Sequence, residues 1–186
     1  MCMQKPQIAV CAPLDAISQR LTQGFVLVGG ISTLPALFLA LSGLLMYPLA
    51  FYGALVCAAV AAGFLTFLVL SWAGMPTQIR IEADALVIER RWHRAVRIGY
   101  ETIEAVTVLP VAADMRATRF AFNAGVFGYH GPFISERYGR FFAYATDRDK
   151  TVAIARRGAP MLVVSPLLPF AFVGALREAL TQKKDT

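Results

Sequence analysis

Apolar and polar positions follow two different patterns along the chain. From Leu21 to Ile79 there is no Asp, Glu, Lys, Arg or His, and apolar residues run almost without interruption. From Arg80 onward, apolar and polar residues alternate in short runs separated by turn residues. The first pattern is long enough for two membrane crossings of about 20 residues each. The second predicts β-strands in a separate folded domain.

The uncharged run predicts a two-helix transmembrane hairpin over residues 24–74. Its helices are expected at about 25–45 and 50–72, because a long apolar run in lipid satisfies its backbone groups as a helix. Pro48 stands in the short link and lacks the N–H needed to continue a helix. The two helices are therefore expected to be close antiparallel neighbours.

Small residues recur at helical spacing on the second helix, where Ala58 stands with Ala62 and Ala59 with Gly63. Faces of this kind let helices approach closely in a membrane. Two interpretations are open: the faces pack the hairpin on itself, or they contact another subunit.

Several short strands are predicted in the alternating part of the chain. "IRIEADALVIERRWHRAVRIGY" contains three runs separated by turns at 83–84 and 92–93. "TIEAVTVLP" gives another strand, which Pro110 ends. "GRFFAYATD" and "KTVAIARR" predict a hairpin around 147–150, and "APMLVVSP" predicts a further strand.

The C-terminal stretch "PFAFVGALREALTQKK" changes to helical spacing. Phe170, Val173, Leu176 and Leu180 are expected on its buried face, and the basic residues near its end suit the helix dipole. The order of these predicted elements along the chain indicates a membrane-anchored α+β protein. A transmembrane hairpin is followed by an antiparallel β-barrel or sandwich with a C-terminal helix as its cap.

These patterns divide the chain into four parts. Residues 1–23 are expected to form an N-terminal cytoplasmic segment that precedes the hairpin. The folded domain is expected over 76–181, followed by a short tail at 182–186.

The domain resembles a known family in several stretches: "IRIEADALVIERRWHRAVRIGYETIEAVTVLP", "GVFGYHGPF", "YGRFFAYATDRDKTVAIARRG" and "VVSPLLPFAFVGAL". Together they resemble bacterial pleckstrin-homology (PH) proteins that carry an N-terminal membrane hairpin. The resemblance covers roughly 76–180 and implies a PH-like fold in a membrane setting. It implies no reaction.

Basic residues predict the direction of the hairpin. The link between the helices has none, whereas Lys5 and Arg20 precede the first helix and five arginines lie between 80 and 97. By the positive-inside rule, both termini face the cytoplasm of a bacterial inner membrane. The three cysteines form no Cys-x-x-Cys pair, and free thiols agree with a reducing compartment.

A basic cluster follows the membrane exit and consists of Arg90, Arg91, Arg94 and Arg97. The chain from Arg80 onward carries 16 basic and 11 acidic residues, a net charge of +5. Each basic residue near an anionic leaflet gains about 1 kcal/mol. The cluster is either a solvated face that fixes topology or a docking site for anionic phospholipid headgroups.

The stretch "FNAGVFGYHGPF" places glycine at 125, 128 and 131. A phosphate-binding loop needs Lys and Ser or Thr after its last glycine and a helix opening there, but Pro132 and Phe133 follow here. Bends or bulges of a small sheet explain the spacing better. Phe127, Tyr129 and Phe133 then fill the core, or contact the bilayer or a partner.

Other chemistry is poorly supported by the sequence. His93 and His130 are isolated from each other and from further metal ligands at characteristic spacing. No nucleophile with a nearby base and no pair of carboxylates stands out. No nucleic-acid-binding motif accompanies the basic residues. We therefore expect no enzyme activity, cofactor, metal or nucleic-acid partner.

The function expected from the sequence is binding or scaffolding at the cytoplasmic membrane surface. The lipid bilayer, anionic headgroups, other membrane subunits and self-association are the expected partners. The alternative is an accessory or assembly subunit of a larger membrane complex. The residues expected to carry contacts are the four arginines at 90, 91, 94 and 97, with Phe127, Tyr129 and Phe133.

Overall fold

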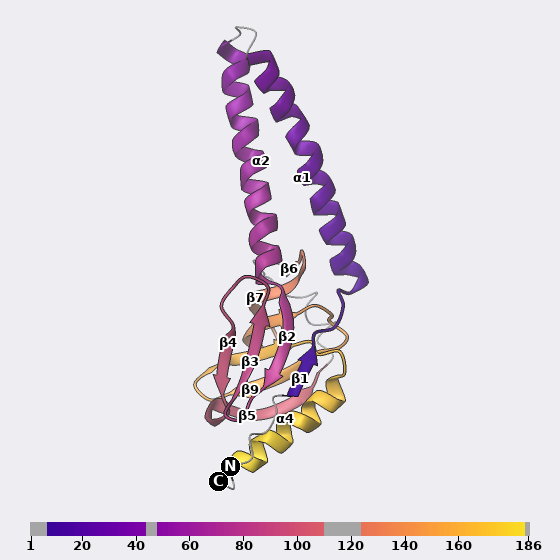
Figure 1. Cartoon of the computed structure of the whole chain (residues 1–186), viewed down its shortest axis with the longest axis vertical. Coiled ribbons are helices and arrows are strands. Elements are labelled where there is room, and N and C mark those ends of the chain that lie inside the picture. The colour runs from indigo at the N-terminus through magenta and orange to yellow at the C-terminus, as the bar shows by residue number, and fades with distance from the viewer. Residues whose placement is uncertain (1–6, 44–47, 110–123, 185–186) are drawn as a thin grey trace.

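The computed structural model describes residues 7–43, 48–109 and 124–184. Two long helices, α1 (Ala16–Gly43) and α2 (Pro48–Gly74), project together from one end of a β-rich domain (Figure 1). Each contains a stretch that is long and apolar enough to cross a membrane. The order predicted from the sequence, two helices, then strands, then one helix, is confirmed, except that a short strand at Gln7–Val10 precedes the first helix.

The helix α1 begins well before the apolar run does. Its first turns, "AISQRLTQ", contain Arg20 and several polar residues, and the Asp15 carboxylate accepts a hydrogen bond from the Ser18 N–H at 2.7 Å. An aspartate in this position satisfies one of the free N–H groups of the first turn. The predicted start near residue 25 marks the onset of apolar residues rather than the beginning of the helix.

The two helices pack against each other through Gly29 of α1 and through phenylalanine rings of both helices. A Cβ on Gly29 would lie only 2.9 Å from the Phe64 ring, and Phe25 stacks on Phe64 with centroids 5.6 Å apart. On α2, by contrast, the small residues Ala58, Ala59, Ala62 and Gly63 are exposed. Packing of the hairpin on itself is therefore the wrong interpretation for these four residues.

The first sheet has four strands in the order β1-β2-β3-β4. They are β1 (Gln7–Val10), β2 (Pro76–Ile81), β3 (Ala85–Arg90) and β4 (Val96–Gly99). All neighbours are antiparallel, and β1 pairs with β2 so that Ile8 lies opposite Arg80. The N-terminal segment, expected to stand apart from the domain, thus supplies an edge strand to its sheet.

The second sheet has six strands in the order β5-β9-β10-β8-β7-β6, and the 3₁₀ turn η1 (Tyr100–Thr102) leads into it. The strands are β5 (Ile103–Val108), β6 (Ala124–Gly125), β7 (Gly128–Ser135), β8 (Gly139–Ala145), β9 (Val152–Arg156) and β10 (Ala159–Val164). Within the described residues, the two sheets do not close into a barrel. Figure 1 shows β1–β4 running along the long axis of the molecule, in the direction of the hairpin.

One predicted pairing is wrong. The strands β8 and β9 were expected to form a hairpin, but β10 lies between them, parallel to β8 and antiparallel to β9. Alternation identifies a strand and its buried face, but it does not identify the partner strand. The connection from β8 to β9 is fixed by side chains instead: the Ser165 hydroxyl accepts a hydrogen bond from the Thr146 N–H at 2.7 Å.

The C-terminal helix α4 (Pro169–Lys184) packs on the main core at the end of the domain away from the hairpin (Figure 1). Phe172, Val173 and Leu176 are buried there, with Leu180 partly buried. Phe170, which was predicted on this face, is 79% exposed. The buried face of α4 is therefore rotated slightly from the predicted one, with Phe172 rather than Phe170 in the core.

The domain has a main core and a second, smaller one. The main core joins both sheets to α4 and includes Ile79, Leu86, Ile154 and Leu162. The second core lies on strands β7, β8 and β10, and consists of Tyr129, Phe133, Phe141, Ala143, Ala145 and Val163. The strands β8 and β10 contribute to both cores, so their side chains are buried on both faces.

Candidate functional site

The exposed turn between β3 and β4 lies directly against the end of α2. The Trp92 N–H donates to the Ala73 carbonyl and the Arg91 N–H donates to the Met75 carbonyl, both at 3.1 Å. The last carbonyl groups of a helix need partners from outside the helix. The turn supplies one of them, and it is thereby fixed at the point where the hairpin meets the domain.

Aromatic and arginine side chains pack together at this junction. The rings of Trp72 on α2 and Trp92 in the turn meet edge to face, with centroids 4.9 Å apart. The Arg91 guanidinium lies 4.7 Å from the centre of the Trp72 ring. A cation over an indole face is attracted by the ring quadrupole. Trp92 itself is 71% exposed, so the turn presents an indole and a guanidinium beside the hairpin.

Two other arginines of the predicted cluster belong to the same turn but differ in role. Arg90 donates from its side chain to the Arg94 carbonyl, with Nε at 3.0 Å, and its guanidinium lies 5.8 Å from the Tyr144 ring. Arg90 therefore holds the turn together. The Arg94 side chain is exposed, and within the described part of the chain it has no ion-pair partner.

Arg97 lies apart from the other three, further along β4. Its guanidinium contacts the Asp84 carboxylate at 2.8 Å and the Glu82 carboxylate at 3.1 Å. The hydrogen bond from Arg97 lowers the pKa of Asp84 below its ordinary value. The structure thus separates a paired Arg97 from Arg91 and Arg94, whose charges face outward.

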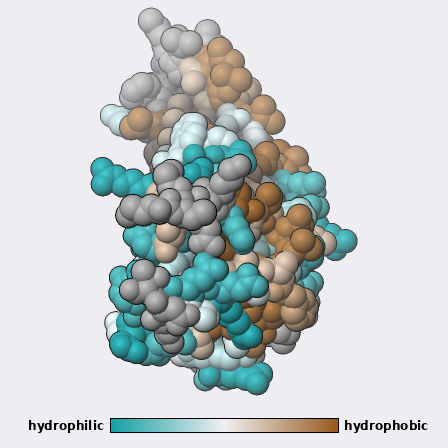
Figure 2. Space-filling model, turned by 60° about the horizontal axis from the view of Figure 1, so that its bottom comes forward, coloured by the Kyte–Doolittle hydropathy of each residue, from teal (hydrophilic) through white to brown (hydrophobic). Residues whose placement is uncertain are grey.

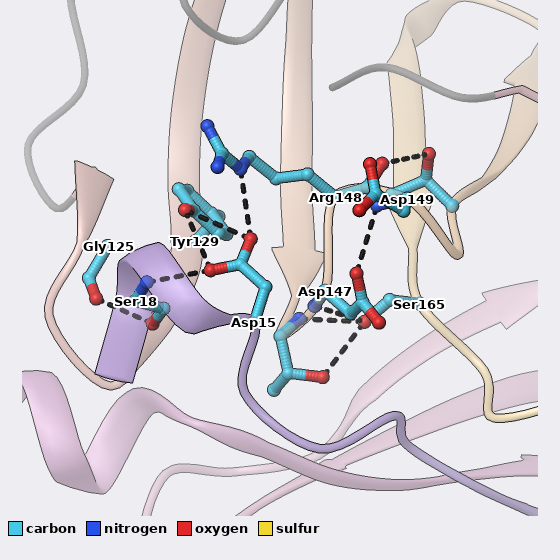
Figure 3. A network of polar contacts seen from close by, with 10 residues as sticks. Asp15, Ser18, Gly125, Tyr129, Asp147, Arg148, Asp149 and Ser165 are labelled. Carbon is cyan, nitrogen blue, oxygen red and sulfur yellow. Dashed lines mark hydrogen bonds and ion pairs between the residues drawn. The ribbon is translucent and has the colours of Figure 1, made fainter. Parts of the chain in front are cut away.

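A polar network joins the start of α1 to the domain (Figure 3). The Asp15 carboxylate accepts from Arg148 Nε at 2.9 Å and from the Tyr129 hydroxyl at 3.3 Å. The Arg148 guanidinium also lies 5.3 Å from the Tyr129 ring. The Ser18 hydroxyl donates to the Gly125 carbonyl at 2.6 Å. Sequence reasoning assigned no role to Asp15 or Arg148, although Asp15 has the position of a helix cap.

The glycine stretch is part of this junction. The Phe127 N–H donates to the Thr22 hydroxyl at 2.8 Å, while Gly125 and Gly128 have φ angles of 129° and 108°. A Cβ on Gly125 would lie 2.7 Å from the Leu21 side chain, and one on Gly128 would lie 2.9 Å from the Ala145 carbonyl oxygen. The glycines therefore let a tight β6–β7 turn approach α1 closely.

The predicted aromatic contact residues are placed differently from one another. Phe133 and Tyr129 are buried in the second core, and Phe127 is half-buried at the turn beside α1. The interpretation that they fill the core applies to Phe133 and Tyr129. Trp92, which the sequence indicated only as a turn residue, is the exposed aromatic of the site.

His130 lies on β7 beneath the end of α2. A Cβ on Gly74 would lie 2.9 Å from the His130 imidazole, so the ring and the helix backbone pack closely. Burial, together with the neighbouring His93 and Arg90, lowers the pKa of His130 from 6.5 to about 4. The neutral ring is the form that fits this contact.

We predict that the chain loses stability when His130 must be protonated. Since its pKa is lower in the folded chain, the unfolded chain binds the extra proton between pH 6.5 and 4. The free energy of unfolding in detergent is expected to fall by about 2 kcal/mol more between pH 7 and 4.5 in the wild type than in His130→Gln. Equal losses in both proteins would contradict this prediction.

Residues 77–180 match a family model described as a bacterial PH domain. No curated protein and no solved structure matches the chain.

Proposed function

The chain belongs to the bacterial PH-domain family, and from this premise we propose that it is a non-catalytic binding module anchored in the bacterial inner membrane. A PH-like domain suggests a binding module. The two candidate spanning helices, α1 and α2, supply the anchor. With both termini in the cytoplasm, the domain lies at the cytoplasmic surface of the membrane.

The ligand that this surface fits best is the anionic phospholipid headgroup. The observation that carries the proposal is the turn from Arg91 to Arg94, which hydrogen bonds hold against the end of α2. Trp92 is suited to the membrane interface, where indole rings are enriched. The Arg91 and Arg94 guanidinium groups then lie at headgroup depth, where each contributes about 1 kcal/mol on an anionic leaflet.

The proposal predicts that lipid selectivity depends on Arg91 and Arg94. The full chain in mild detergent is titrated with equal amounts of phosphatidylglycerol and phosphatidylcholine, and native mass spectrometry measures the two lipids bound. We expect preference for phosphatidylglycerol in the wild type. In Arg91→Gln/Arg94→Gln, phosphatidylglycerol affinity should fall by about 30-fold, the equivalent of about 2 kcal/mol.

Arg97→Gln is the matched control, because it removes the same charge from a side chain that Asp84 and Glu82 already neutralise. It should leave lipid selectivity unchanged. Unchanged selectivity in the double variant, or an equal loss in Arg97→Gln, would show that the turn only helps to fix topology.

A second candidate function is that of an accessory subunit in a membrane complex. It is favoured by the exposed small residues of α2 at 58, 59, 62 and 63, which the hairpin leaves free. Faces of this kind let a further helix approach closely in lipid. Purification in mild detergent followed by native mass spectrometry tests it, and a chain that remains alone would count against it.

A further inference from the structure

An apolar groove of about 320 Å³ lies between the strand β1 and the helix α4. Ile8 and Val10 line one side, and Leu167 and Leu168, which directly precede α4, also line the groove. Figure 2 shows apolar residues gathered along one side of this end of the domain. The groove is separate from the turn that carries Arg91 and Arg94, and the binding of lipid headgroups makes no use of it.

The groove is bordered by large apolar side chains that face solvent. Ile8 is 56% exposed, Leu168 is 67% exposed, and the neighbouring Phe170 is also exposed. Edge strands of soluble domains are normally protected by charges or by a covering element. Exposed apolar patches of this kind mark interaction sites.

The backbone of β1 also has unused hydrogen-bonding groups. Since the Cys11 N–H donates to the Thr77 carbonyl on β2, alternation directs the N–H and C=O groups of Ile8 and Val10 to the opposite edge. The Val10 carbonyl accepts from the Leu167 N–H at 2.9 Å. The N–H and C=O groups of Ile8 and the N–H group of Val10 have no backbone hydrogen-bond partner among the described residues. They form a short template for one more strand.

The bilayer and a second copy paired antiparallel do not fit this geometry. The bilayer is at the wrong end of the molecule, because α4 lies at the end of the domain away from the hairpin (Figure 1). A second copy pairing its own β1 antiparallel would be inverted, since β1 runs along the same axis as the helices (Figure 1). Its hairpin would then point away from the membrane that holds the first. This step rests on the membrane anchoring in the proposed function.

We propose that this groove binds an extended segment of a different cytoplasm-exposed polypeptide, which adds to the sheet as a strand beside β1. Strand addition combines main-chain hydrogen bonds with pockets for alternate side chains. The segment carries apolar residues at alternate positions, and these enter the groove beside Leu168.

The charge of Glu178, beside the groove, restricts which residue the bound segment carries at its end. Ala171 and Ala175 line the groove, and Glu178 follows on the same helical face, past the groove. Glu178 is exposed and has no ion pair within the described residues. A Lys or Arg at the corresponding end of the segment would pair with Glu178, and an acidic residue there would be repelled.

The test is photocrosslinking of the full chain in the membranes of the organism that encodes it. Leu168→benzoylphenylalanine places the probe in the groove, and Leu34→benzoylphenylalanine on α1 is the control. We expect the groove probe to crosslink one polypeptide other than this chain. Mass spectrometry should map the crosslink to a segment with alternate apolar residues. The control should not give this product.

A second variant tests strand addition itself. Ile8→Pro removes an outward N–H while leaving β1 paired with β2, because proline is tolerated at an edge strand whose N–H faces solvent. It should reduce the crosslink at least tenfold. A synthetic peptide of the mapped segment should bind the full chain in nanodiscs, and Ile8→Pro should weaken that binding at least tenfold. An unchanged melting temperature in Ile8→Pro would show that the fold is intact.

A crosslink to this chain itself, to lipid alone, or to a helical segment insensitive to Ile8→Pro would overturn the proposal, as would the absence of any crosslink. Alkaline extraction of the same membranes tests the anchor independently. A chain that stays in the membrane but gives no partner crosslink refutes the groove proposal alone. A chain that is extracted refutes the membrane anchor instead.

Discussion

Arg148→Ala is expected to lower the free energy of unfolding by about 3 to 5 kcal/mol, because it leaves the Asp15 carboxylate buried without its charge partner. The two side chains are only 12% and 10% exposed, and Nε of Arg148 lies 2.9 Å from the carboxylate. The remaining partners of Asp15, the Tyr129 hydroxyl and the Ser18 N–H, cannot neutralise its charge. The Arg148 guanidinium also lies 5.3 Å from the centre of the Tyr129 ring, so its loss opens space there.

This variant can be measured by urea unfolding of the full chain in mild detergent. Trp72 and Trp92 are the only two tryptophans in the chain, and their fluorescence reports on the junction. Lys150→Ala is the matched control: its ammonium lies 3.8 Å from Asp147 and is partly exposed. Because the Lys150 side chain is 42% exposed and its contact with Asp147 is long, water screens this pair, which contributes less than about 1 kcal/mol.

The double variant Asp15→Leu/Arg148→Met separates charge from packing. Replacing both partners of a buried pair by apolar residues of similar volume is often neutral. We therefore expect it to recover part of the stability that Arg148→Ala loses, since the Ser18 N–H and the Tyr129 hydroxyl also lose their acceptor. If Arg148→Ala itself stays within about 1 kcal/mol of the wild type, the pair does not hold α1 on the domain.

The position of this pair explains what the sequence could and could not predict. The two spanning helices and the individual strands are local features, and hydrophobic period identifies them. Asp15 and Arg148 are far apart in the chain, and each occurs in a stretch that suggests only a cap or a turn. Their contact depends on how β1 and α1 attach to the second sheet, and no local pattern encodes that attachment.

The same limit applies to strand pairing and to the candidate site. The strand β1 has only four residues, "QIAV", which is too short for alternation to identify, and β10 enters between two strands adjacent in sequence. The arginines at 90–97 were recognised as one group by spacing alone. Acidic residues on a neighbouring hairpin decide which of them keeps a free charge, and this required the fold.

Phe133 and Phe170 lie in environments opposite to those that their sequence positions suggested. Phe133 is the last residue of the glycine stretch and a candidate contact residue, yet it is 1% exposed and stacks on Phe141 with centroids 5.6 Å apart. Phe133→Ala should destabilise the chain by about 3 to 5 kcal/mol, since a buried ring is replaced by a cavity. The lost ring pair contributes a part of this, about 1 kcal/mol.

Phe170→Ala is the matched control, because the same substitution is made in a residue that the sequence placed in the core. Its side chain faces solvent at the start of α4, so the change should stay within about 0.5 kcal/mol. Urea unfolding in detergent measures both variants, and native mass spectrometry measures their lipid selectivity. Phe133→Ala should keep its preference for phosphatidylglycerol when folded, because the ring does not face the membrane. A stable Phe133→Ala protein with altered lipid selectivity would instead make this residue part of a contact surface.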